Sequence, residues 1–215
     1  MNSYGAVGSY VQLTFQTKFP TFTPDQFMAS LKDKNYSMTQ GTANLPSGQM
    51  ITTQIFSKQN LSVFISPSTN QIFFQILNTI NPQEIIEKEI KNILVYLNIV
   101  EEVLLSVMFT FNTSVPSKGD PHSNLTSLLD QKFRKHCKDI LQNSLGVTSL
   151  RLASSFPIEK DGLQLIVEPL GTDPKHRYYL NLTYVTDKMH KFNDFIDKFG
   201  ERMVLELMDG IDKNE

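Results

Sequence analysis

The chain has 215 residues, 40% of them hydrophobic and 20% charged, and carries a formal net charge of −2. It can bury a sizeable core, while a pI near 6.1 gives it no global attraction to nucleic acid or to an anionic membrane. The lone cysteine, Cys137, excludes an intrachain disulfide framework and a zinc site made of several cysteines.

The N-terminal ten residues lack the basic and apolar regions of a secretory signal. No apolar run approaches the roughly 20 residues that a membrane-spanning helix needs. The sequence therefore predicts a cytoplasmic protein that makes no contact with a membrane.

Two stretches, residues 11–19 and 101–115, alternate apolar and polar residues as strands do. Glu102, Ser106, Met108, Thr110 and Asn112 define the polar face of the second stretch. We expect its apolar face to carry Val103, Leu105, Val107, Phe109 and Phe111, with Leu104 as the one apolar exception.

Between these strands the sequence predicts a helix, four short strands and another helix. The first helix covers residues 24–34 with Thr23 as its cap, and the second covers 82–97 with Asn81 as its cap. Turn residues separate the four strands, which cover residues 36–44, 50–57, 61–66 and 71–78.

The second half begins with the strand over residues 101–115. A helix over 123–145 follows, with Gly146 ending it, and the last helix covers 188–208 with Gly200 inside it, where a close helix–sheet approach is expected. The strands between these helices cover residues 147–155, 162–168 and 177–186.

Both long helices of the second half show an apolar stripe at helical spacing. In the last helix we expect Phe192, Ile196, Phe199 and Met203 to pack against the sheet. The earlier helix carries a stripe of Leu125, Leu129, Phe133, Cys137, Ile140 and Leu141. Its basic residues are interpreted as a solvated face: Lys132, Arg134, Lys135 and Lys138.

The predicted fold class is α+β, with one large, mostly antiparallel sheet and four helices on one face. Residues 1–9 form a flexible tail, and residues 10–98 and 102–211 form two similar halves of one compact domain. In each half the predicted order is a strand, a helix, several antiparallel strands and a second helix. This shared order favours an internal duplication. A single α+β domain whose elements happen to recur is the alternative.

This element order resembles the two-repeat saddle of the TATA-binding proteins and, more loosely, the helix-grip folds. The resemblance covers most of the chain and rests on topology. It implies a pseudo-twofold arrangement of the two halves and contributes no site residues.

No catalytic or metal-binding motif is present. None of the four histidines has the i, i+4 spacing of a helical metal site, and Cys137 lies on an apolar stripe, as a buried small hydrophobe does. Fingerprints for nucleotide binding and for a nucleophilic serine are missing as well. We therefore expect no cofactor and no metal, and binding rather than catalysis.

Two sets of residues are candidates for binding. Lys175, His176 and Arg177 concentrate cationic donors at a turn and could hold an anionic group; a charged hairpin tip is the alternative. The other set is the uncharged polar face that the long strands would share: Gln12, Thr14, Gln16, Thr110, Asn112, Asn181 and Thr183.

The predicted function is thus binding of an unidentified ligand or protein, through the polar sheet face or the cleft between the halves. A saddle-shaped nucleic-acid-binding protein is one alternative, opposed by the acidic pI and the shortage of cations on the candidate face. An enzyme with an unrecognised site is the other. A homodimer is also expected, because an open sheet leaves edge strands that can pair with another chain.

Overall fold

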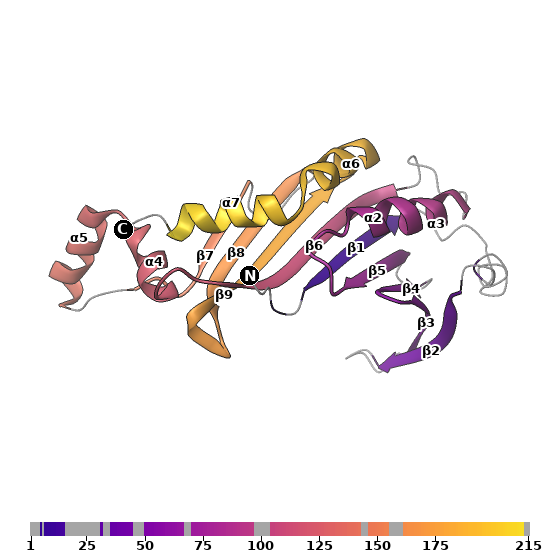
Figure 1. Ribbon diagram of the computed structural model, residues 1–215, viewed down its shortest axis with the longest axis horizontal. Coiled ribbons are helices and arrows are strands. Elements are labelled where there is room, and N and C mark those ends of the chain that lie inside the picture. The colour runs from indigo at the N-terminus through magenta and orange to yellow at the C-terminus, as the bar shows by residue number, and fades with distance from the viewer. Residues whose placement is uncertain are drawn as a thin grey trace.

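The protein has an α+β fold built on a nine-stranded antiparallel sheet (Figure 1). The computed structural model describes residues 5, 7–15, 31, 35–44, 50–66, 70–96, 104–142, 146–154 and 161–212. The prediction of one large antiparallel sheet is confirmed, with the strand order β2-β3-β4-β5-β1-β6-β9-β8-β7.

The two alternating stretches form the centre of this sheet, where β1 pairs antiparallel with β6. The strands are β1 (Gly8–Phe15), β2 (Ser37–Asn44), β3 (Met50–Lys58), β4 (Leu61–Ser66), β5 (Gln71–Leu77), β6 (Leu104–Pro116), β7 (Leu150–Ala153), β8 (Gly162–Leu170) and β9 (Asp173–Thr186).

Helices cover one face of the sheet. The helical elements are α2 (Gln83–Ile85), η3 (Ile86–Ile90), α3 (Lys91–Tyr96), α4 (Pro121–Ser127), α5 (Gln131–Leu141), α6 (Met189–Lys198) and α7 (Glu201–Asp212). The first three form one continuous helix with a π-helical turn in its middle. Figure 1 shows this helix, α6 and α7 lying along the same face, α4 at the end of the sheet, and α5 beyond it.

The described residues therefore contain five helices rather than four, and α5 does not lie on the sheet. The predicted helix over 24–34 falls outside the described residues except for Leu31, which is helical and buried.

The core lies between the sheet and these helices. Phe109 and Phe111 are fully buried, and the ring centroid of Phe199 lies 5.0 and 4.9 Å from theirs. Phe192 and Ile196 are buried as predicted, whereas Met203 is only partly buried. Burying aromatic side chains of this size is a dominant source of stability in a core.

Two neighbouring residues of the central strand, Leu104 and Leu105, face opposite to the prediction. Leu104 is buried at 4% exposure, and Leu105 is 45% exposed. The cause is an irregularity in the β1–β6 pairing, in which Thr14 pairs with Ser106 but Phe15 pairs with Leu104. An extra residue on one strand turns the side chains around it to the opposite face.

The predicted helix over 123–145 is wrong, because the chain forms two helices there. Asp130 adopts an extended ψ of 134° and caps α5, its carboxylate accepting from the backbone N–H groups of Lys132 (2.9 Å) and Phe133 (3.0 Å). The helix then ends at Leu141, four residues before the predicted end, with the following Gln142 in the left-handed region at φ 50°.

The last predicted helix is also two helices. Phe199 is extended, with ψ 144°, and separates α6 from α7. Gly200 faces the start of another helix rather than the sheet, since a Cβ there would lie 3.0 Å from the Asn81 side-chain oxygen. That oxygen accepts from the Glu201 backbone N–H at 3.1 Å, so Asn81 holds α7 instead of capping its own helix, whose N-cap is Pro82.

Two strands begin earlier than predicted. β1 starts at Gly8, inside the segment expected to be a tail, and the preceding Val7 carbonyl accepts from the Asn78 backbone N–H at 2.9 Å. β9 starts at Asp173, so Lys175, His176 and Arg177 lie within a strand and not in the turn that precedes it.

Candidate functional site

The sheet surface opposite the helices, called the open sheet face here, gathers most of the predicted polar residues. Strand pairing sets Tyr10 beside Thr110, which in turn lies beside Thr183, and sets Asn112 beside Asn181. The predicted members that share this face and are half-buried are Gln12, Thr14, Thr110, Asn112, Asn181 and Thr183. Gln16 lies outside the described residues.

Hydrogen bonds between β6 and β9 hold several of these side chains in place. The Asn112 side-chain oxygen accepts from the Tyr179 hydroxyl at 2.8 Å and from the Asn181 amide at 2.5 Å. The hydroxyls of Thr110 and Thr183 lie 3.4 Å apart. Burial raises the pKa of Tyr179. These hydrogen bonds fix the side-chain orientations on this part of the surface.

A row of aromatic rings on the same face was missed by the sequence analysis. Tyr10, Phe73 and Phe64 follow one another across β1, β5 and β4, with centroid distances of 5.3 and 5.8 Å. All three are half-buried. The signal was present, because Phe73 and Phe64 alternate with the buried Phe74 and Val63 and must therefore point away from the core.

Among the described strands, charged residues lie only at the margin of the open sheet face. The sequences of β1, β4, β5 and β6 contain no charged residue. Arg177 and Glu168 lie near one end of the face, on β9 and β8, and Arg151 lies on the edge strand β7. The central surface can therefore contact an uncharged partner without desolvating an ion, which would be costly.

The predicted anion-binding residues are consecutive on an extended strand, so their side chains alternate between the two faces. The guanidinium of Arg177 donates to the Ser114 carbonyl at 3.0 Å and to its hydroxyl at 3.2 Å. His176 lies 2.8 Å from the Asp173 carboxylate, and Lys175 is exposed. The strand does not converge these three side chains on one point.

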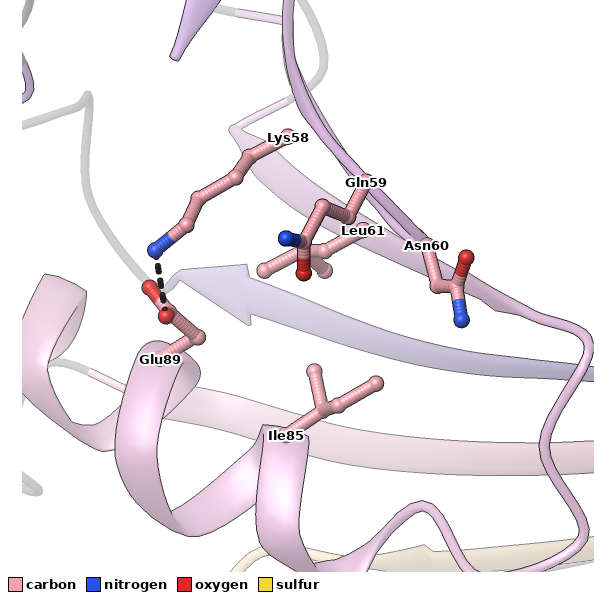
Figure 2. Close-up of a pocket in the computed structure, with 6 residues that line it drawn as sticks. All are labelled: Lys58, Gln59, Asn60, Leu61, Ile85 and Glu89. Atoms are coloured by element: carbon pink, nitrogen blue, oxygen red, sulfur yellow. Dashed lines mark hydrogen bonds and ion pairs between the residues drawn. The ribbon is translucent and has the colours of Figure 1, made fainter. Parts of the chain in front are cut away.

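A small cavity of about 90 Å³ lies on the helix side of the sheet (Figure 2). Glu89, carried by the π-helical turn, is 2.7 Å from the Lys58 ammonium and accepts from the Tyr36 hydroxyl at 2.9 Å. Burial, and then the hydrogen bond to Glu89, raises the pKa of Tyr36 well above its usual range. The ionisable groups are thus paired with each other, and they tie the helix to the residue before β2 and to the end of β3.

A larger cavity of about 390 Å³ lies where α7 meets the segment after β6. Asp212 is its central group: one carboxylate oxygen accepts from Asn124 (2.9 Å) and Tyr178 (3.0 Å), and the other from the Lys118 backbone N–H (3.2 Å). The Lys118 side chain is 67% exposed and pairs with Asp209 at 2.5 Å. These hydrogen bonds join α7 to α4, to β9 and to the segment after β6.

Among the described residues, no group of three or more His, Cys, Asp or Glu side chains is placed to hold a metal ion. No helix in the described part of the chain is long and apolar enough to cross a membrane. No family model, curated protein or solved structure matches the chain.

Proposed function

We propose that the protein is a non-enzymatic binding module whose open sheet face contacts an uncharged or weakly charged surface of a partner. One observation carries this proposal: a sheet face that no described helix covers combines an aromatic row with pre-ordered amides and hydroxyls, and has no charge on its described central strands. The partner itself is not identified, and a cytoplasmic location remains a prediction from the sequence.

The chemistry of this surface suits contact with another molecule. Fully burying one Phe side chain contributes roughly 1.5–3 kcal/mol, and Tyr10, Phe64 and Phe73 each retain part of that area for a partner. Beside them, Asn112 and Asn181 are already oriented by hydrogen bonds, which lowers the entropy lost on binding.

The test compares two variants, each with one added negative charge, on opposite sides of the sheet. Gln12→Glu charges the open sheet face, and Asn92→Asp makes the same amide-to-carboxylate change on α3. Immobilised wild type and both variants are exposed to extract from the source cells, and retained molecules are quantified by mass spectrometry. We expect a retained set that Gln12→Glu loses and Asn92→Asp keeps; identical retention by all three proteins contradicts the proposal.

The aromatic row favours a second candidate, single-stranded nucleic acid. Bases stack on exposed aromatic side chains, and each such contact is worth about 1–3 kcal/mol. If this is the partner, fluorescence anisotropy with labelled oligo(dT) will show binding that Phe73→Ala weakens about tenfold. The shortage of cations on the face argues against this candidate, and absence of binding at low salt rejects it.

We further propose that the halves of the sheet are related by an approximate twofold axis between β1 and β6, the arrangement that the resemblance to TATA-binding proteins implies. The outward order β5-β4-β3-β2 on one side and β9-β8-β7 on the other supports it. An experimental structure in which residues 8–96 do not superpose on 104–212 would contradict the duplication.

A homodimer through β2 is also proposed. The two edges of the sheet differ, because β7 is four residues long and contains Arg151, whereas β2 has eight residues and no charge. Uncharged edges are the ones open to pairing with another chain. Light scattering should give twice the 24.5 kDa chain mass, and Thr39→Lys should give one chain mass. A monomeric wild type at high micromolar concentration rejects the dimer.

A further inference from the structure

Helix α5 presents an apolar side that no other part of the described structure covers. None of its eleven residues is buried, and Phe133, Ile140 and Leu141 are 54%, 64% and 55% exposed. Figure 1 shows the helix at one end of the molecule, clear of the sheet. Large apolar side chains gathered on one exposed surface mark a site of interaction.

The charges of α5 are arranged around this apolar side. At about 3.6 residues per turn, Lys132 lies on one flank of the stripe and Arg134 and Lys138 on the other, while Lys135 lies on the opposite side. Asp139 is the only acidic residue of the helix. The α5 surface, defined as Phe133, Ile140, Leu141 and these flanking cations, is therefore both apolar and strongly basic.

We propose that the α5 surface binds the surface of an anionic phospholipid bilayer. A helix of this kind lies in the interface with its apolar face among the acyl chains, and its Lys and Arg side chains reach the headgroups. Because the headgroups form a flat anionic surface, they can contact the cations on both sides of the apolar stripe at the same time. A second copy of the chain is disfavoured, because facing α5 helices would bring two sets of three flanking cations together.

The expectation of no membrane contact rested on the missing apolar run and on the charge of the whole chain, neither of which reveals a local concentration of cations on one helix. Binding through α5 requires no spanning helix, because the helix lies along the surface. It also uses a different part of the molecule from the open sheet face, so each proposal can fail without the other.

The test is flotation of the purified full-length protein with vesicles of phosphatidylcholine alone or with added phosphatidylserine. We expect the protein to float only with phosphatidylserine vesicles, and binding to weaken as salt screens the charges. Phe133→Ser should reduce affinity about tenfold or more. The residue is exposed, so an unchanged melting temperature verifies that this variant is folded.

Two lysines of the same helix provide the matched control. Lys138→Gln should weaken binding about fivefold, the contribution of one cation near an anionic surface, and Lys135→Gln should weaken it less, since Lys135 lies opposite the stripe. A second readout uses the lone cysteine: an environment-sensitive fluorophore on Cys137 should shift to shorter wavelength when phosphatidylserine vesicles are added.

Three results would overturn the proposal. The first is no flotation with phosphatidylserine vesicles, and the second is equal flotation with both kinds of vesicle. The third is a dimer in light scattering that Phe133→Ser converts to a monomer, because the apolar stripe would then belong to a second copy of the chain.

Discussion

Helices α5 and α6 have the same kind of sequence and opposite environments. Each carries apolar residues at helical spacing, yet Phe192 and Ile196 of α6 are about 1% exposed, while Phe133 and Ile140 of α5 are more than half exposed. An amphipathic pattern establishes that a helix has a side to cover. It does not establish that the same chain covers it.

The difference comes from what the neighbouring residues do. α6 follows β9 directly and returns over the sheet, where the Phe195 ring stacks on Tyr184 at 4.3 Å. α5 follows a break at Asp130, whose side chain starts a new helix beyond the end of the sheet. The apolar stripe predicted for a single helix over residues 123–145 is therefore divided between α4 and α5. Only its α4 part, with Leu125, packs in the core.

The largest expected effect comes from shortening one phenylalanine in each helix. Phe192→Ala should lower the free energy of unfolding by about 3–5 kcal/mol, because it removes a buried ring and leaves a cavity. Phe133→Ala should change it by less than about 0.5 kcal/mol. Urea unfolding measures both. A similar loss for the two variants would show that α5 packs as tightly as α6.

A smaller effect is expected from the helix caps. Asp130→Ala should cost about 1 kcal/mol of α5 stability, since Asp130 satisfies two backbone donors. Lys188 makes no side-chain cap for α6, so Lys188→Ala should be nearly neutral. Hydrogen exchange will separate the two: α5 amides exchange faster in Asp130→Ala, and α6 amides are unchanged in Lys188→Ala. Unchanged α5 exchange would mean that contacts other than the cap hold this helix.

The smallest effect concerns the tie between α6 and the start of β8. Asp161 lies 2.5 Å from the Lys191 ammonium and accepts from the Thr186 hydroxyl at 2.6 Å. The hydrogen bond from Lys191 and then that from Thr186 lower the pKa of Asp161. A lowered carboxyl pKa adds stability above the unfolded value of about 3.9, and that contribution is lost as pH falls through the folded value.

Asp161→Asn keeps the side-chain shape at a left-handed position, φ 63°, that Asn also tolerates. Its urea midpoint should therefore lie slightly below that of wild type at pH 7, and the gap should narrow as the pH falls below about 3.9. A gap that is constant from pH 7 to pH 3 would show that the carboxylate charge contributes nothing to the folded state.

The strands were predictable because alternation reports burial directly. The β6 pattern identified Phe109 and Phe111 as core residues, and failed only at Leu104 and Leu105, where a pairing irregularity that depends on the partner strand reverses the faces. The helix breaks at Asp130 and Phe199 were not predictable from the spacing of apolar residues alone. The same helical spacing of apolar residues can continue across two successive helices that differ in direction.

The open sheet face was predictable in part. Its polar residues follow from the alternation of the strands. The same alternation also predicts that Phe64 and Phe73 point away from the core. The order β1 beside β6, which brings Gln12 and Thr110 onto one surface, depends on long-range pairing that one sequence does not encode locally.

Site-specific photo-cross-linking tests the central claim, a partner on the open sheet face, most directly. A benzophenone side chain replaces Gln12 or Thr110 on that face and, as the control, Arg202 on α7, whose side chain is 92% exposed. After irradiation in cell extract, we expect discrete adducts from Gln12 and Thr110 and none from Arg202. No adducts from the face, or the same adducts from all three positions, would contradict the account.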